Sequence, residues 1–442
     1  MKKFLFLTSI IISLSFVCSC SSPTGNSNND NNSETETTSP SSENPETPTP
    51  PAEEPVINFV LSTDSTYYIV GENRYTKIEN LNIPSEYKGL PVKEIDSFAF
   101  AWNNSIKTVS IPESIIKIEK KAFYSIDNLE LVYFNAKDCE LISGDSSSEL
   151  GTFENSGKNV SNGVKFIIGN KAKKVPDNFL CADTLQSTTC EKTLIKEILF
   201  EENSVCEEIG NYSFSKQNLS NFDYPNTVVK LGKSAFENCK ISSNKLVHNN
   251  LQYIGDLCFG ESSFEEVELP ESVAYLGYSI FYNNKTLKTI RIKCNADTES
   301  SLENMLSGRS PYRGAGTEAE GVDFIIGSKV KKITADVFSD YGVYPKSFTF
   351  EEGSQLETIG KRAFKKVSAV GNISFPNTLK RIEESAFYEC KNFNTESFPS
   401  SLEFIGLNAF ANCTALTCKK PIASDTLTIE TNAFYGCTNM QE

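Results

Sequence analysis

Cysteine, histidine and paired carboxylates are the residue types in this chain that could do chemistry. Of its 442 residues, 13 are cysteine and 1 is histidine, His248. The sequence has no C-x-x-C pair, H-E-x-x-H motif, Gly-rich phosphate loop or G-x-S-x-G elbow. His248 lies in the polar run 245–250 and is interpreted as an exposed loop residue. The chain is therefore predicted not to be an enzyme and to need no cofactor or metal.

The carboxylates are interpreted as solvated surface rather than as a site. The chain has 57 Asp+Glu against 42 Lys+Arg, a formal charge of −15, and pairs such as Glu201-Glu202 and Glu351-Glu352 fit that excess. Affinity for nucleic acid comes from clustered Lys and Arg, so nucleic acid is not expected as a partner.

The cysteines recur at one position of a repeated pattern. Four of them follow a phenylalanine by three residues: Cys239, Cys390, Cys413 and Cys437. Free cysteine behaves as a small hydrophobe, so these are predicted to form a buried column rather than disulfides. A bridge between Cys190 and Cys206, or between Cys181 and Cys190, remains an alternative elsewhere in the chain.

The first residues predict export. Residues 1–19 combine a positive start with an apolar stretch too short to span a membrane comfortably, which is typical of a signal peptide. The run Val17-Cys18-Ser19-Cys20 resembles the lipobox of bacterial lipoproteins, and this resemblance implies a lipid anchor on Cys20. An ordinary cleaved signal with an incidental cysteine is the alternative. Ser21 differs from the Asp that retains some lipoproteins at the inner membrane, which favours the outer membrane.

Residues 20–55 are predicted to be a disordered tether. They are rich in Ser, Thr, Pro and Glu, carry seven acidic residues and contain no Lys or Arg. Such a chain would span about 35 Å as a flexible coil.

Residues 56–442 repeat a single pattern, in which an aliphatic residue, three variable residues and a small residue precede Phe. Within each run of repeats these phenylalanines lie 22 to 24 residues apart. The clear copies end at Phe100, Phe123, Phe214, Phe236, Phe259, Phe281, Phe364, Phe387, Phe410 and Phe434, and degenerate copies end at Phe179 and Phe338. A fixed period of this length indicates a repeat solenoid of twelve stacked coils.

Between successive phenylalanines the sequence predicts a short strand and a compact turn. Stretches such as Ile106–Pro112 and Ile373–Pro376 alternate aliphatic and polar residues and end in proline, which stops a strand. One coil is therefore expected to contain a strand, a turn, a short second segment and either a tight turn or a single helical turn carrying the Phe.

The repeat resembles the BspA-like class of leucine-rich repeats. The matching pattern [IL]-G-x-x-A-F-x-x-C occurs at Leu231–Cys239 and Ile405–Cys413, and Ile83–Val92 resembles the first coil of such arrays. The resemblance implies a curved leucine-rich-repeat array of parallel strands, a surface or secreted location, and binding or adhesion without catalysis. In three copies a glutamate replaces the motif's glycine, so that position is not expected to require a positive φ.

A longer duplication crosses the repeats. Gly163–Gly169 returns as Gly321–Gly327 after 158 residues, and Phe123 and Phe281 differ by the same amount. Before each of these segments lies a stretch rich in Ser, Gly, Asn and Glu, near 136–162 and 294–320. Both stretches are predicted to be inserted loops rather than coils.

If the aliphatic positions of each strand point inward, the residues between them line the concave sheet, the surface that solenoids commonly use for partners. These candidate ligand-face residues are Ser110, Tyr133, Asp223, Glu268, Arg291, Thr349, Ser374 and Ser397. The mixture of charge and size favours a protein partner.

Two functional hypotheses follow. The first is an adhesin-like protein, lipid-anchored to the bacterial outer membrane and exposed at the surface, that binds host or neighbouring-cell proteins through the concave face or the insertions. The second is a periplasm-facing scaffolding lipoprotein of the cell envelope. In both hypotheses the membrane contact is made by the N-terminal lipid only.

Overall fold

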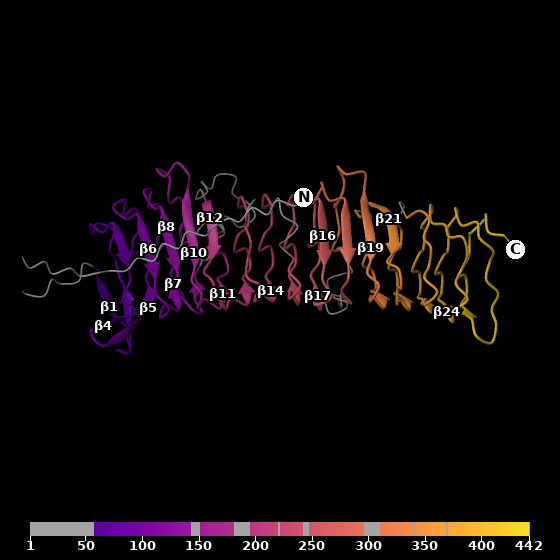
Figure 1. Cartoon of the computed structure of the whole chain (residues 1–442), viewed down its shortest axis with the longest axis horizontal. Coiled ribbons are helices and arrows are strands. Elements are labelled where there is room, and N and C mark those ends of the chain that lie inside the picture. The colour runs from indigo at the N-terminus through magenta and orange to yellow at the C-terminus, as the bar shows by residue number, and fades with distance from the viewer. Residues whose placement is uncertain are drawn as a thin grey trace, which may run out of the picture. The chain divides into compact units, whose positions relative to one another are not determined.

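The alternating apolar stretches form short strands, and the strands of successive coils pair in parallel to build an elongated solenoid (Figure 1). The computed structural model describes residues 57–142, 151–180, 195–219, 222–241, 247–295, 310–339, 342–367 and 370–441. Within these ranges the solenoid has about 13 turns of about 24 residues and no helix. The predicted signal peptide, Cys20 and the tether lie outside the described residues.

Two sheets of longer strands form what we call the long-strand face. The first has the order β12-β10-β8-β6-β3 and the second β16-β18-β19-β21, with every pair parallel. Their bounds are β3 (Asn80–Asn82), β6 (Thr108–Ile111), β8 (Leu131–Phe134), β10 (Val164–Ile168), β12 (Ile195–Phe200), β16 (Glu266–Leu269), β18 (Thr289–Ile292), β19 (Val322–Ile326) and β21 (Pro345–Phe350).

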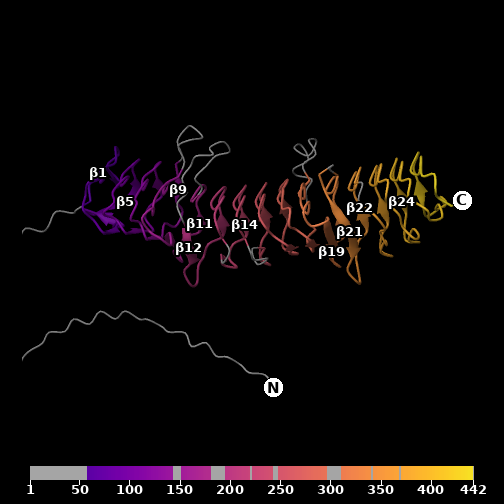
Figure 2. The same ribbon diagram turned by 90° about the horizontal axis from the view of Figure 1, so that it is seen from above.

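Three further sheets, mostly of two-residue strands, form the short-strand face (Figure 2). The first sheet contains β1 (Phe59–Leu61), β2 (Tyr68–Val70), β4 (Glu86–Tyr87), β5 (Leu90–Ile95), β7 (Lys117–Ile118) and β9 (Glu140–Leu141). The second contains β11 (Lys174–Val175), β13 (Glu208–Ile209), β14 (Lys230–Leu231), β15 (Tyr253–Ile254) and β17 (Tyr275–Leu276). The third contains β20 (Lys332–Ile333), β22 (Thr358–Ile359), β23 (Arg381–Ile382), β24 (Phe404–Ile405) and β25 (Thr428–Ile429).

The repeat aromatics form a continuous column inside the solenoid. Each ring from Phe100 to Phe434 contacts the ring of the next coil, with centroids 4.8 to 6.4 Å apart. Aromatic pairs contribute about 0.5–1.5 kcal/mol each beyond the burial of their surface. Because each coil shares its column contacts with both neighbours, no coil buries its Phe by itself.

The described residues of the two stretches predicted as inserted loops contain rings that join the aromatic column, while residues 143–150 and 296–309 lie outside the described ranges. Phe153 stacks on Phe123 with centroids 5.2 Å apart, and Tyr312 stacks on Phe281 at 6.4 Å. Within the first stretch, β9 also pairs with β7. These two rings occupy the repeat-Phe position without the motif around them, so the motif alone does not reveal their coils.

Of the two predicted forms of the Phe-bearing segment, the structure has the tight turn. In coil after coil the residues two before and two after the Phe have positive φ, as Ser234 (51°) and Asn238 (55°) do around Phe236. The motif glycine is a different position: Gly232 is not among the residues with positive φ, as expected. A Cβ at Gly232 would lie 2.6 Å from the backbone N of Asn211, so this glycine serves close coil stacking.

The cysteine column is buried, as predicted for Cys239, Cys390 and Cys413, and the thiols of Cys390 and Cys413 are free. The structure adds a polar role, because each sulfur in the column donates a hydrogen bond to a main-chain carbonyl of the preceding coil. Cys390 Sγ lies 2.8 Å from Phe364 O, and Cys239 Sγ lies 3.0 Å from Phe214 O. Other coils place a different donor at the same position: Ser156, Ser262 and Asn284 bond the carbonyls of Phe123, Phe236 and Phe259. We call this the donor ladder.

Candidate ligand-binding face

The outward side chains of the first long-strand sheet form one row across neighbouring strands. Register places Ser110 beside Tyr133, Tyr133 beside Ile167, and Ile167 beside Leu199. They point outward because the residues on either side of each are the aliphatic or aromatic residues that fill the core. Two of these four, Ile167 and Leu199, were not predicted as face residues.

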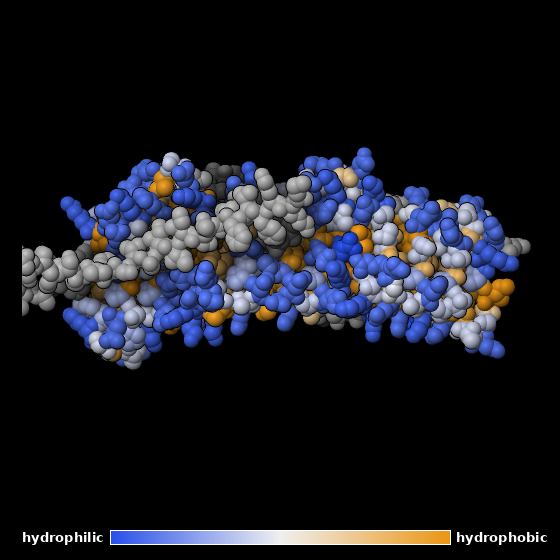
Figure 3. All heavy atoms as spheres, viewed as in Figure 1, coloured by the Kyte–Doolittle hydropathy of each residue, from blue (hydrophilic) through white to orange (hydrophobic). Residues whose placement is uncertain are grey.

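Three members of this row are apolar, and we call Tyr133, Ile167 and Leu199 the apolar row. Tyr133 is 36% exposed and Leu199 is 38% exposed, while Ile167 between them is half-buried. The next outward row of the same strands holds Leu131, Lys165 and Glu197, and Lys165 Nζ lies 3.0 Å from a carboxylate oxygen of Glu197. In the second half of the solenoid, Figure 3 shows hydrophobic and pale residues lying between hydrophilic ones.

The second long-strand sheet repeats this geometry with different chemistry. Glu268 lies beside Arg291, Arg291 beside Ile325, and Ile325 beside Thr349. The Arg291 guanidinium contacts Glu268 on one side, at 3.5 Å, and Glu351 on the other. The pKa of the Glu351 carboxyl lies below its usual value, because the backbone N–H of Ser328 and then Arg291 bond it. The charged side chains of this row on the second sheet therefore form ion pairs with one another and with Glu351.

The remaining predicted face residues also point outward but lie outside the long strands. Asp223, Ser374 and Ser397 are exposed and belong to no strand. A parallel bridge joins Asn372 to Asn394, so register places Glu396, and not Ser397, beside Ser374. The strand predicted over Ile373–Pro376 is therefore reduced to an isolated bridge, although Ile373 and Phe375 remain buried.

His248 is packed, contrary to its interpretation as an exposed loop residue. Its side chain is 14% exposed and its ring lies 4.3 Å from that of Tyr224. Nδ1 lies 2.6 Å from Asn226 Oδ1, and Nε2 lies 3.0 Å from Asp223 Oδ1. The imidazole therefore connects two coils through these contacts, which is a structural role.

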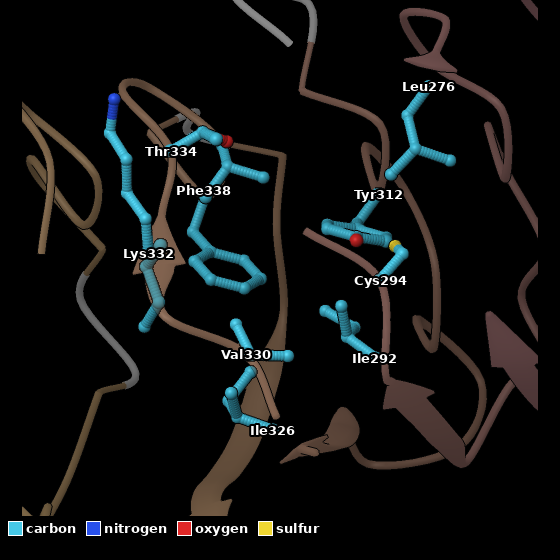
Figure 4. Close-up of a pocket in the computed structure, with 11 residues that line it drawn as sticks. Leu276, Ile292, Cys294, Tyr312, Ile326, Val330, Lys332, Thr334 and Phe338 are labelled. Carbon is cyan, nitrogen blue, oxygen red and sulfur yellow. The ribbon is translucent and has the colours of Figure 1, made fainter. Parts of the chain in front are cut away.

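A small cavity of about 30 Å³ lies between coils beside Tyr312 and Phe338 (Figure 4). Leu276, Ile292, Cys294, Tyr312 and Phe338 are among its lining residues. Burial raises the pKa of the Tyr312 hydroxyl well above its ordinary value. The cavity has room for about one water molecule, so it is a packing gap beside an irregular coil and not a ligand pocket.

Within the residues that the structure describes, no group of three or more His, Cys, Asp or Glu side chains is placed to hold a metal ion. No helix long and apolar enough to cross a membrane occurs among those residues either.

A sequence model described as "BspA type Leucine rich repeat region" matches the chain in six copies, over residues 72–150, 183–301 and 319–441. These ranges cover more than half of the sequence. No curated protein matches the chain.

Solved structures of repeat proteins resemble the chain at low identity. A leucine-rich repeat protein from Bacteroides ovatus is 18% identical, with a TM-score of 0.41, over 85% of this chain and 97% of that one. A leucine rich cell surface protein from Faecalibacterium prausnitzii is 16% identical, with a TM-score of 0.27, over 88% and 87%. The pneumococcal vaccine antigen PcpA is 16% identical, with a TM-score of 0.31, over 86% and 82%.

Proposed function

Since this chain belongs to the BspA-type leucine-rich repeat family, we propose that it is an adhesin-like binding protein that engages a protein partner through its long-strand face. The proposal includes export and a lipid anchor on Cys20 in the bacterial outer membrane, with the solenoid exposed at the surface. The predicted tether would hold the solenoid away from the lipid. Scaffolding inside the envelope is the competing location.

The apolar row carries this proposal. Tyr133, Ile167 and Leu199 are adjacent by register and at least partly exposed, and the Lys165–Glu197 ion pair borders Ile167 and Leu199. A tyrosine and two aliphatic side chains within a polar rim have the composition of a protein-binding hot spot. The equivalent row of the second sheet offers Glu268 and Arg291 already engaged in ion pairs. The first sheet is therefore the preferred contact surface.

The binding test uses two leucines of equal exposure. Leu199 and Leu407 are both 38% exposed, but only Leu199 belongs to the apolar row. Labelled protein is applied to host and neighbouring-species cells, and the variant Tyr133→Ser/Leu199→Ser is expected to lose about tenfold or more in affinity, as hot-spot truncations do. Leu407→Ser should bind as the wild type does. Equal losses in both variants, or none in either, would remove the apolar row from the contact surface.

The location is tested on intact producing cells. External protease should digest the solenoid, and Cys20→Ala should release the protein from the cell pellet. Complete protection until the outer membrane is opened would place the solenoid in the periplasm and overturn the adhesin role. Digestion with unchanged pelleting of Cys20→Ala would overturn only the lipid anchor.

A further inference from the structure

The two faces of the solenoid end at different heights beside the first coil. β3 and β5 belong to this coil, and the sheet of β5 continues outward through β2 and then β1. Among the described residues, β3 is the last strand of its own sheet and pairs with β6 only. At about 4.8 Å per strand, the short-strand face therefore extends about 10 Å further at this end. Figure 1 shows β1 and β4 at the indigo end of the solenoid, where this step lies.

The main chain of two residues points toward the second side of β3, which we call the free edge. In a parallel pair, alternate residues direct both N–H and C=O to the same neighbouring strand. The C=O of Glu79 and the N–H of Ile83 both bond main-chain groups of β6. Asn80 and Asn82 therefore direct their N–H and C=O away from β6. In the part of the chain that the structure describes, these groups have no hydrogen-bond partner.

An open groove of about 630 Å³ lies along the free edge. Asn80 and Asn82 are among its lining residues, together with the apolar side chains of Ile57, Phe59 and Tyr87. The rings of Phe59 and Tyr87 stack on each other, with centroids 4.3 Å apart and planes at 21°, and both are half-buried. The groove thus combines unpaired strand groups with an apolar wall that is already ordered. Such a combination binds extended peptides, because the main chain gives affinity and alternate side chains fill the apolar part.

Protection of an edge does not account for this groove. Natural proteins shield free edges with short strands, prolines and charges, and β3 has only three residues with Pro84 shortly after them. These devices limit how long a pairing segment can be. Stacked aromatic rings open to the groove add nothing to such protection, whereas they favour the side chains of a short bound segment.

The two ends of the groove carry opposite charges. Lys77 precedes β3 and Glu86 follows it, and both are exposed lining residues. The carboxylate of Glu79 lies 2.7 Å from Lys107 Nζ, whereas no ion pair among the described residues involves Lys77 or Glu86. A complementary segment therefore has an acidic residue at the Lys77 end and a basic residue at the Glu86 end.

We propose that an extended peptide segment of a partner protein adds to the free edge of β3 as a further strand. Its main chain bonds Asn80 and Asn82, and its apolar side chains contact Phe59 and Tyr87. This contact does not depend on the apolar row, because strand addition uses main-chain groups at the end of the array and not side chains of the long-strand face.

A library of random nine-residue peptides displayed on phage supplies the probe. It is selected on the chain from residue 20 onward carrying Cys20→Ser, which omits only the predicted signal and its lipid. Enriched peptides should alternate apolar and polar residues, lack a central proline and carry opposite charges at their two ends. Absence of enrichment, or enrichment of peptides without alternation, would overturn the proposal.

The main-chain contact is tested with Asn82→Pro and its control Asn82→Ser. Proline removes the N–H at the free edge without removing a bond to β6, and edge strands tolerate it, so the fold should be kept and circular dichroism checks it. The best selected peptide, made synthetically, should bind Asn82→Pro about tenfold or more weakly than the wild type. It should bind Asn82→Ser normally, because the main-chain groups remain. Equal affinity for the two variants would refute strand addition.

The charges at the ends are tested independently of that variant. Lys77→Glu/Glu86→Lys should prefer, by about threefold or more, a version of the peptide with its terminal charges exchanged. The wild type should prefer the original peptide. An unchanged preference in the double variant would show that the segment does not lie between these two residues, and would overturn the proposed site.

Hydrogen exchange tests the free edge directly. The Asn82 amide should exchange rapidly in the free protein and at least about tenfold more slowly with saturating peptide. The Leu81 amide, which faces β6, should be protected in both states. Slow exchange of Asn82 in the free protein would overturn the proposal, because the edge would already be covered, and so would exchange that bound peptide leaves unchanged.

Discussion

Removing one member of the donor ladder should destabilise the array through the loss of a buried hydrogen bond between coils. Cys390 has no exposed surface and its Sγ donates to Phe364 O at 2.8 Å. Burial raises the pKa of this thiol to about 12, so it keeps its proton at neutral pH. Phe364 O also accepts a hydrogen bond from Val367 N–H, so it keeps one donor in the variant, and the lost bond costs about 0.5–1.5 kcal/mol. Cys390→Ala adds a packing loss of about 1 kcal/mol, and we expect it to lower the free energy of unfolding by about 1.5–2.5 kcal/mol.

Two further variants separate the hydrogen bond from the volume. Cys390→Ser keeps a donor at the position where Ser262 bonds Phe236 O, so it should lie within about 1 kcal/mol of the wild type. Cys390→Val fills the space without a donor and should lose about 1–2 kcal/mol. Urea denaturation followed by circular dichroism gives the values, and hydrogen exchange of the neighbouring coils localises them. A valine variant as stable as the wild type would show that the sulfur only fills space, and would refute the ladder as a source of stability.

Three other outcomes follow from the same coordinates. Ser385→Gly should raise the free energy of unfolding by up to about 1 kcal/mol and Ser385→Val should lower it, because φ is 56° there; thermal unfolding would show a fault in this reasoning if both variants lost stability. Among the nine described cysteines Cys437 alone is not fully buried, so alkylation with peptide mapping should modify it first, and early modification of Cys206, whose pKa burial raises to about 12, would contradict the packing. The pKa of Glu351 is lowered in the folded protein, so its charged carboxylate contributes stability at pH values above 4.5, and this stability is lost as the pH falls through the folded pKa; Glu351→Gln should therefore flatten the acid limb of a stability–pH curve. Burial raises the pKa of Glu237, so its charged form costs stability at neutral pH, and Glu237→Gln should raise the free energy of unfolding there. The opposite signs would refute both assignments.

The sequence predicts what is local and periodic in this fold. Alternation is enough to place Val109 and Ile111 inside and Ser110 outside, and the spacing of the phenylalanines is enough to predict the column. Phe153 and Tyr312 escaped prediction because each takes the Phe position without the motif, after a segment of irregular length. Only the contact with the neighbouring coil identifies them.

The candidate face shows the same division. Tyr133 follows from alternation, and the same rule applied to Val164–Ile168 places Ile167 outward as well. What alternation cannot give is register: that Ile167 lies between Tyr133 and Leu199 depends on how strands separated by more than 30 residues align. The hydrogen bonds of the cysteines could not be predicted from the sequence either. Cys, Ser and Asn differ in chemistry, and only the structure shows that Cys390, Ser156 and Asn284 donate to equivalent carbonyls in their coils.

The 158-residue duplication has a consequence for how the protein would hold a partner. Six steps of the aromatic column separate Phe123 from Phe281, which at ~4.8 Å per coil places equivalent strands of the two long-strand sheets, such as β8 and β18, about 30 Å apart. A partner with two matching patches at that separation would bind the second patch as an intramolecular event, and its avidity would exceed either affinity by about 10²–10⁴. Because the apolar row lies on the first sheet and the ion pairs of Arg291 lie on the second, such a partner would bind in one polarity only. The solenoid would then select a partner by the spacing of its two patches and by its orientation along the array, as well as by surface chemistry.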